Sequence, residues 1–237
     1  MQELIYQLDS YIREFSAKVV KRFDEGVILD RTAFHPRSGG VANDLGVIIK
    51  GVSRYEVVDV VFSDDGVLHV IKGGTSGIEV GDVVSGVIDW DRRYRLMRLH
   101  TAAHVLAAIF FRDYNALITG GNVSPEYAYD DYSLEVFDRG IFEDVIMKAN
   151  EVIRSDAEVK IYWLDRDEAL KIPGVVKLAS KMPPDVSKLR IVEIPGIDIQ
   201  ADGGPHVKRL SEVGEIVLIN LENKGRKRKR LYYSVRP

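Results

Sequence analysis

The sequence predicts an α+β protein in which a small, β-barrel-like N-terminal domain (residues 1–90) precedes a C-terminal α+β domain (residues 91–237). Three observations support this division. The first ninety residues consist mostly of short, regularly spaced strand segments, a helical pattern of apolar residues begins near residue 91, and further strand and helix segments are mixed after it. A run of strands that is followed by mixed elements is typical of α+β proteins.

The strand segments of the N-terminal domain include one clear hairpin. Residues 54–62 are rich in β-branched and aromatic side chains, residues 63–66 (SDDG) supply a turn, and residues 67–71 return as the second arm. Residues 82–90 form another strand of the same kind. Strands at such regular spacing indicate a small barrel or sandwich.

The second domain is expected to begin with a helix over residues 91–112, because apolar residues recur there at intervals of three and four. The same pattern predicts a second helix over residues 143–155. Strands are expected at residues 115–123, 132–137, 159–163, 191–194, 215–221 and 230–235.

Composition limits the class of protein. The chain has 237 residues, of which 46% are hydrophobic and 29% are charged, as in ordinary globular proteins. No apolar stretch approaches the roughly 20 residues of a membrane span, and no secretory signal is visible. The chain contains no cysteine, which excludes disulfides and thiolate ligands. We therefore expect a cytoplasmic protein with no membrane association.

Two basic clusters stand out on a chain whose net charge is −3. The first lies at the start of the predicted helix and contains Arg92, Arg93, Arg95 and Arg98. The second occupies six of seven consecutive positions, namely Lys224, Arg226, Lys227, Arg228, Lys229 and Arg230. Either cluster alone is equally compatible with a solvated helix face or tail. Two such clusters on an otherwise acidic protein favour a polyanionic partner.

Two pairs of potential metal ligands are the most specific feature of the chain. His100 and His104 lie four residues apart in the predicted helix, so their imidazoles share one face. Asp202 and His206 have the same offset in a loop rich in glycine and proline. Together they form a complete tetrahedral zinc set, or three ligands and a labile position. A lone histidine pair is more often a polar surface feature, but apolar neighbours indicate an interior location for this one. The helix lacks the glutamate of zinc proteases, because Thr101 follows the first histidine.

Residues 89–106 (DWDRRYRLMRLHTAAHVL) closely resemble the alanyl-tRNA editing proteins of the AlaX type, which are freestanding relatives of the alanyl-tRNA synthetase editing domain. Further motifs of the longer, two-domain members are similar, in order, to residues 32–46 (TAFHPRSGGVANDLG), 118–122 (ITGGN) with 131–135 (DYSLE), 202–206 (DGGPH) and 223–225 (NKG). The similarity extends from about residue 30 to the C-terminus.

The resemblance implies a hydrolase that cleaves the ester between a wrong amino acid, serine or also glycine, and alanine tRNA. A small alanine pocket rejects a ligand with one extra hydroxyl by only about a hundredfold, so a second sieve is needed. The resemblance also implies one zinc ion per chain, bound by His100, His104, Asp202 and His206. The family usually has cysteine at the position of Asp202, threonine at Pro205 and glutamine at Val41. The carboxylate of Asp202 is therefore either the fourth ligand or a neighbour of three histidine ligands.

Two roles for the metal stay open at this point. It either lowers the pKa of a bound water to about 7, which makes a nucleophile, or it holds the amino group of the substrate. The catalytic residues we expect are His100, His104 and His206, through the metal, together with Gly203 and Gly204, whose backbone amides are candidates to stabilise an oxyanion.

Five residues are expected to bind the substrate. Thr119 has a hydroxyl that suits the serine side chain, and the matching family segment has a threonine with that role; otherwise it is a β-branched strand residue. The others are Gly39, Gly40, Asn43 and Asp44, in a loop that is equally well explained as a tight turn.

Eight basic residues are expected to contact phosphates of the alanine tRNA, namely Arg92, Arg93, Lys224, Arg226, Lys227, Arg228, Lys229 and Arg230. No obligate protein partner is inferred. Two other function classes are compatible with the sequence: an RNA-binding module with a purely structural metal, and a metal-dependent hydrolase for a small ester or amide.

Overall fold

The structure is a computed structural model that describes residues 2–177 and 185–237. The chain divides into two compact units, Met1–Leu96 and Met97–Pro237. The division we expected near residue 90 falls at the start of helix α2 (Trp90–Tyr114), whose first residues belong to unit 1 and whose remainder belongs to unit 2.

Unit 1 is built around a closed barrel with the strand order β2-β3-β7-β6-β5-β8. Its strands are β2 (Glu14–Arg22), β3 (Gly26–Leu29), β5 (Gly46–Lys50), β6 (Ser53–Ser63), β7 (Gly66–Ile71) and β8 (Val83–Ile88). Helix α1 (Ile5–Leu8) and the short parallel pair β1 (Glu3–Leu4) and β4 (Arg31–Thr32) precede or interrupt the barrel. The predicted hairpin is present as β6 and β7, with Ser63 opposite Gly66.

Apolar residues of the barrel strands point inward and fill its interior. In β7, for example, Val67 and Ile71 are buried in the same cluster as Val57 and Val60 of β6. His69 also points inward and is fully buried, with Nε2 lying 2.7 Å from Thr32 Oγ1.

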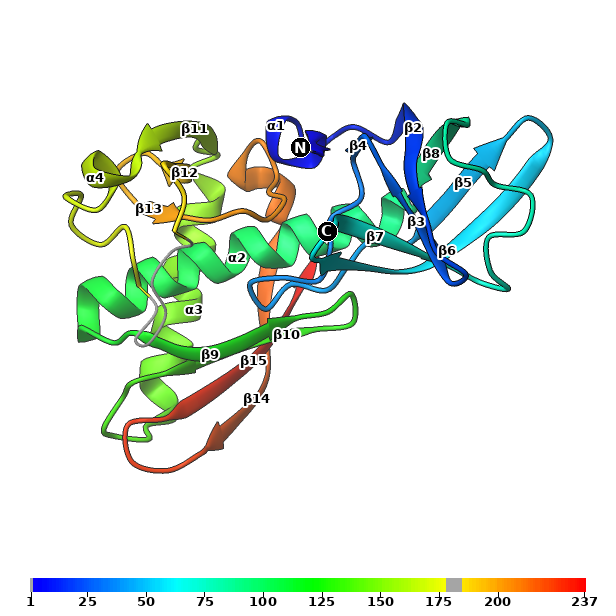
Figure 1. The fold of residues 1–237 in the computed structure, drawn as a ribbon. Coiled ribbons are helices and arrows are strands. Elements are labelled where there is room, and N and C mark those ends of the chain that lie inside the picture. The colour runs from blue at the N-terminus through cyan, green and yellow to red at the C-terminus, as the bar shows by residue number, and fades with distance from the viewer. Residues whose placement is uncertain (1, 178–184) are drawn as a thin grey trace. The chain divides into compact units, whose positions relative to one another are not determined.

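Unit 2 contains a four-stranded sheet with the order β14-β15-β10-β9, shown with its helices in Figure 1. The strands are β9 (Ile118–Val123), β10 (Ala128–Tyr132), β14 (Glu215–Asn223) and β15 (Lys229–Arg236). One face packs against helices α2 and α3 (Arg139–Arg154): the ring of Phe110 on α2 stacks on Tyr132 at 3.8 Å and meets Phe142 on α3 edge-on at 5.6 Å.

A second, three-stranded sheet has the order β11-β12-β13. The loop that leaves β13 carries Asp202 and His206 and is called the ligand loop. It consists of β11 (Lys160–Asp165), β12 (Lys188–Ile194) and β13 (Asp198–Ala201), and helix α4 (Arg166–Ala169) packs beside it. The 3₁₀ helix η1 (Leu210–Val213) follows the ligand loop and leads into β14.

The predicted α+β fold with an N-terminal barrel is confirmed, but one expected strand is wrong. Residues 133–137 form no strand, and β10 lies earlier, at Ala128–Tyr132. The chain then reaches α3, which Asp138 caps, its carboxylate accepting a hydrogen bond from Gly140 N at 2.8 Å. The helix therefore begins at Arg139, four residues before the position predicted from apolar periodicity. Within residues 2–177 and 185–237, no helix is long and apolar enough to cross a membrane.

Candidate metal centre

Helix α2 supplies two of the four candidate ligands and the loop after β13 supplies the other two. His100 and His104 lie one helical turn apart and are 6% and 5% exposed. Asp202 and His206 lie on the loop that leaves β13. Arg190 of β12 holds this loop, since its Nη1 donates to the backbone carbonyls of Asp202 and Gly204 at 2.9 Å each.

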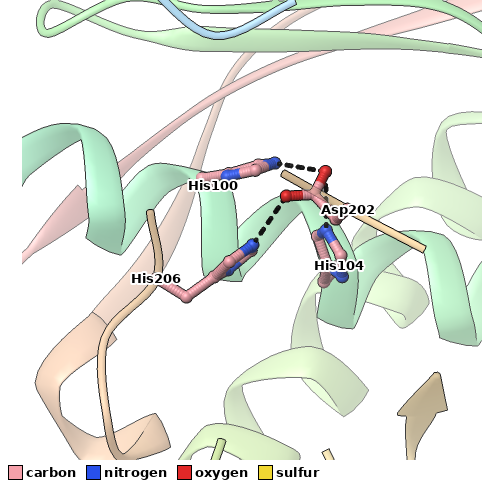
Figure 2. Close-up of side chains that lie close together, drawn as sticks. All are labelled: His100, His104, Asp202 and His206. Carbon is pink, nitrogen blue, oxygen red and sulfur yellow. Dashed lines mark hydrogen bonds and ion pairs between the residues drawn. The ribbon is translucent and has the colours of Figure 1, made fainter. Parts of the chain in front are cut away.

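The four side chains converge on one point, as Figure 2 shows. Their candidate ligand atoms all lie within 4.8 Å of one another. Nε2 of His100, His104 and His206 lies 3.5, 3.9 and 3.3 Å from the Asp202 carboxylate. The rings of His100 and His206 stack at 4.2 Å, and that of His104 stands edge-on to both.

Each imidazole has a partner for the nitrogen that faces away from this point. Nδ1 of His104 donates to Asp198 Oδ2 at 3.0 Å, and Nδ1 of His100 donates to the carbonyl of Pro205 at 3.3 Å. Carboxylates and carbonyls only accept hydrogen bonds, so the proton of each neutral ring lies on Nδ1. The Nε2 lone pair is then directed at the point where the four side chains converge. Nδ1 of His206 lies 3.1 Å from Thr101 Oγ1. Such partners behind the ligating histidines are the usual support of a metal site.

The donor set fits a divalent ion. With bonds of about 2.0–2.2 Å, tetrahedral ligand atoms lie roughly 3.3–3.6 Å apart. His206 Nε2 lies 3.3 Å from Asp202 Oδ1 and His100 Nε2 lies 3.5 Å from Asp202 Oδ2, which is near that spacing, whereas His104 Nε2 lies 3.9 Å from Oδ2. Three imidazoles and one carboxylate are also ligands that zinc accepts. The four residues therefore form a compact donor set of the kind that binds zinc.

Electrostatics at the centre favour a cation. Burial opposes ionisation of Asp202, but its interactions with the histidines, that with His100 first, outweigh burial and hold its pKa well below the ordinary value. Burial alone would lower the pKa of His104, yet hydrogen bonds with Asp198 and Asp202 raise it to about 9. Burial and the neighbouring imidazoles lower the pKa of His206. Two carboxylates thus remain charged around buried imidazoles.

Asp198 is itself anchored by a buried cation and an amide. Lys177 Nζ lies 2.6 Å from Asp198 Oδ1, and Gln200 Nε2 donates to Asp198 Oδ2 at 2.9 Å. Burial opposes ionisation of Asp198, and His104 and Lys177 outweigh that effect and lower its pKa. The carboxylate behind His104 is therefore fixed in position and charged.

Gly204 allows the loop to approach His100 closely. A Cβ atom at this position would lie 2.7 Å from His100 Cε1 and 2.9 Å from its Nδ1. The amide of Gly204, however, donates to Asp202 Oδ1 at 2.6 Å. The Asp202 carboxylate is thus the acceptor of this N–H in the structure, and the oxyanion role of Gly204 stays a prediction. Gly203 is exposed and its oxyanion role stays a prediction.

Thr119 lies on β9 of unit 2 and is half-buried. Its Oγ1 donates to the backbone carbonyl of Asp131 at 3.2 Å, next to a register shift between β9 and β10. The bond uses the single hydroxyl proton and leaves the oxygen lone pairs as acceptors. Recognition of a serine hydroxyl by Thr119 stays a prediction.

The glycine motif of unit 1 forms a tight turn. Ser38 and Val41 exchange backbone hydrogen bonds around Gly39 and Gly40, which have φ of +59° and +85° and are exposed. Positive φ at both central positions is the requirement of a type I′ turn, which favours glycine. Their contact with substrate stays a prediction.

The expected substrate contacts of Asn43 and Asp44 are corrected, because both side chains are buried and bonded inside unit 1. Asn43 Nδ2 donates to the carbonyl of Asp44 at 2.9 Å. The Asp44 carboxylate accepts from the backbone N of His35 at 2.6 Å and from the guanidinium of Arg93.

Two of the expected RNA contacts are also corrected. Arg93 is 0% exposed, and its guanidinium donates to Asp44 and to the carbonyls of Ser10 and Ala33. Lys229 is 2% exposed, and its Nζ donates to the carbonyl of Gly225 at 2.6 Å. Neither cation can reach a phosphate.

The other cations predicted to bind RNA remain accessible to different degrees. Arg92 and Arg230 are half-buried, whereas Lys224, Arg226, Lys227 and Arg228 are exposed in or next to the β14–β15 turn. Their RNA contacts stay predictions.

The residues behind the ligands were missed from the sequence. They are Thr101, Lys177, Arg190, Asp198 and Gln200. One signal was available, because Asp198 and Gln200 alternate along β13 and so share a face of the sheet.

Two protein-family models match the chain: tRNA synthetases class II (A) over residues 4–92, and threonyl and alanyl tRNA synthetase second additional domain over residues 189–232. The chain is 54% identical over 240 residues to the alanyl-tRNA editing protein AlaX-M of Saccharolobus solfataricus, with 100% of both chains covered. It is 39% identical over 241 residues to AlaX-M of Methanosarcina barkeri, with 99% of both covered. It is 36% identical over 228 residues to an alanine–tRNA ligase of Saccharolobus islandicus, which covers 93% of this chain and 25% of the ligase.

Proposed function

Because the chain belongs to the AlaX-M family of alanyl-tRNA editing proteins, we propose that it hydrolyses the ester between serine and alanine tRNA, with glycine as a second amino acid that it removes. The reaction adds water across the ester and releases the free amino acid and the tRNA hydroxyl. The observation that carries the proposal is the convergence of His100, His104, Asp202 and His206 on one point, with their atoms within 4.8 Å.

We propose that these four residues hold one zinc ion. When bound, zinc supplies Lewis acidity, which serves either to acidify a water or to hold the amino group of the substrate. The protein residues hold the ligand geometry. Asp198, Pro205 and Thr101 orient the three imidazoles, and Arg190 fixes the loop that carries Asp202 and His206.

Substrate selection is proposed to depend on Thr119, whose hydroxyl oxygen keeps its lone pairs for the hydroxyl of a seryl group. A hydrogen bond to serine that alanine lacks would let the site release serine and spare correctly charged tRNA. Exposed cations at the β14–β15 turn, Lys224, Arg226, Lys227 and Arg228, are proposed to contact phosphates.

The test is incubation of the protein with seryl-, glycyl- and alanyl-tRNA(Ala), before and after metal removal by a chelator and after addition of zinc. We expect seryl- and glycyl-tRNA(Ala) to be hydrolysed well above the spontaneous rate only when metal is present, and alanyl-tRNA(Ala) to be spared. Hydrolysis that chelation leaves unchanged would rule out a metal-dependent reaction. No hydrolysis of any of the three esters would rule out the proposed hydrolase activity.

A second function is favoured by one observation. Four protein ligands close a tetrahedral site, as in structural zinc centres, whereas catalytic centres commonly keep one position open. The alternative is an RNA-binding module whose metal only stabilises the fold. It predicts tRNA binding without hydrolysis and loss of folded protein on chelation.

A further inference from the structure

The four-stranded sheet of unit 2 has one face that no helix of the described chain covers. Tyr132 of β10 points to the other face, where it stacks on Phe110 of α2. Alternation along the strands places Tyr129 and Asp131 of β10 on the uncovered face. Their direct cross-strand partners on β15 are Tyr232 and Arg230.

Three tyrosines gather on this face. The rings of Tyr129 and Tyr232 lie 5.5 Å apart at 51°, and those of Tyr127 and Tyr232 lie 5.9 Å apart at 56°. Tyr127 is 41% exposed and the other two are half-buried. The neighbours on the outer strands are small or polar: Asn122 on β9 lies opposite Tyr129, and Asn220 on β14 lies opposite Tyr232. Among the described residues, no large side chain therefore lies directly opposite Tyr129 or Tyr232 on the outer strands, so a base can stack on Tyr127 and Tyr232 directly and on Tyr129 through the guanidinium that lies over it.

Arginine makes the same face rigid and positive. The guanidinium of Arg230 lies over the Tyr129 ring, 3.8 Å from its centroid, and forms two hydrogen bonds with Asp131, at 2.7 and 2.9 Å. Arg228 donates to the same carboxylate at 2.8 and 2.6 Å. Two arginines therefore share one carboxylate, which leaves a net positive charge. Glu222 borders the patch as well; it accepts from the Tyr232 hydroxyl and pairs with Lys224.

We propose that this tyrosine–arginine face, defined by Tyr127, Tyr129, Arg228, Arg230 and Tyr232, binds unpaired RNA nucleotides by stacking their bases on the tyrosine rings. Aromatic residues on the two central strands of a four-stranded sheet stack bases in the same way in RNA-recognition domains, although the fold here is different. Stacking needs only the flat face of a base and so requires no sequence preference. The inference rests on the proposed function only in taking tRNA as the natural partner, and it assigns a binding surface apart from the four ligands.

The test measures binding of a fluorescein-labelled, single-stranded RNA of about 12 nucleotides, which spans one to several stacking sites. Tyr129→Thr and Tyr232→Thr remove the ring but keep a residue that favours strands. We expect each to weaken binding about tenfold or more, and Tyr232→Phe to restore binding to within about threefold. The matched control is Trp163→Thr, which removes an exposed aromatic residue from the other sheet.

Salt dependence separates stacking from charge. We expect the tyrosine variants to leave the slope of log K against log salt unchanged, whereas Arg226→Ala reduces it by about one. Equal losses in Trp163→Thr and the tyrosine variants, or full affinity in the tyrosine variants, would overturn the proposal.

A measurement on the wild-type protein tests the proposal even if the variants fail to fold. Hydroxyl-radical footprinting should show that the RNA protects Tyr127, Tyr129 and Tyr232 but not Trp163, and absence of this protection would overturn the proposal. Hydrolysis of seryl-tRNA(Ala) is measured in parallel. If the tyrosine variants lose RNA affinity but the wild type does not hydrolyse seryl-tRNA(Ala), the proposed hydrolase activity is refuted and the stacking surface stands. If the wild type shows metal-dependent hydrolysis but the tyrosine variants keep full RNA affinity, the stacking surface alone is refuted.

Discussion

His104 donates a hydrogen bond from Nδ1 to Asp198 Oδ2 at 3.0 Å, across 94 residues of chain. The first strand residue of β13 therefore sets the orientation of a helix ligand. We expect Asp198→Asn to weaken zinc binding by about 10- to 100-fold, because a support behind a histidine ligand is worth that much. The measurement is competition with a chelating dye. Asp113→Asn, which removes a carboxylate that pairs with Lys148 away from the four ligands, is the comparison; an equal loss there would mean that general destabilisation is responsible.

The identity of the fourth ligand can be tested by Asp202→Cys and Asp202→Ala. A thiolate is a softer donor with the same charge, so we expect the cysteine variant to bind zinc at least about tenfold more tightly. The alanine variant should bind zinc at least about tenfold less tightly, because one of four donors is removed. Asp167→Ala, an exposed carboxylate on α4, is the control. Unchanged zinc affinity in Asp202→Ala would exclude this carboxylate from the ligand set.

Gly204 has a steric role that Gly204→Ala tests. The added methyl group would lie 2.7 Å from His100 Cε1, closer than such contacts allow, and a tight 3.2 Å from Asp202 Oδ1, so the ring or the loop must move. We expect zinc affinity and seryl-tRNA(Ala) hydrolysis to fall together by about tenfold or more, since small displacements of site residues are costly. Wild-type zinc affinity with reduced hydrolysis would instead point to a direct role of this glycine in the reaction.

The buried pair of Arg93 and Asp44 predicts a stability effect without an effect on RNA. Both side chains are 0% exposed. We expect Arg93→Leu to lower the free energy of unfolding by about 3–5 kcal/mol, because it leaves the Asp44 charge buried and unpaired. The double variant Arg93→Leu with Asp44→Leu should recover part of that loss. Denaturant unfolding measures both, and a change in the salt dependence of tRNA binding by Arg93→Leu would contradict the structural role.

Local patterns in the sequence were sufficient for the parts of the site that depend on short spacing. The i, i+4 offsets of His100 with His104 and of Asp202 with His206 predicted that each pair would face one way, and the hairpin at β6 and β7 followed from alternation and a turn. That the two pairs form one ligand set was a hypothesis from their donor types, to which the resemblance added support; their convergence depends on the packing of α2 against the loop after β13 and is visible only in the structure.

Residues whose role depends on distant partners were not predictable. Arg93 belongs to a run of arginines that resembles an exposed basic face, and its burial is explained by distant partners, chiefly Asp44, 49 residues away. Asp198 becomes a support for a ligand only through the register of β13 with β12. Strand register and helix packing determine both roles, and neither is visible in a window of sequence.

Asp130 gives the protein a stability that depends on pH. It lies on the helix-covered face of β10 and is 5% exposed, and its Oδ2 accepts from Tyr233 Oη at 2.8 Å. Burial raises its pKa to about 7 and outweighs the hydrogen bonds from Tyr233 and Tyr132, which act in the opposite direction. In the unfolded chain the pKa is about 3.9. Between these values the folded state binds more protons, so the free energy of unfolding falls as pH rises from about 4 to 7.

Asp130→Asn should remove this fall in the free energy of unfolding with rising pH. The amide keeps an oxygen that accepts from Tyr233 and carries no charge. We expect the variant to exceed the wild type in free energy of unfolding by roughly 2–4 kcal/mol at pH 8 and by much less at pH 4. Denaturant unfolding at both pH values measures the difference. Asp131→Asn is the opposite control, because Arg230 and Arg228 outweigh burial and lower the pKa of Asp131. That variant should therefore be less stable than the wild type at pH 8, and a gain in both variants would show that removal of charge, rather than the burial of Asp130, is responsible.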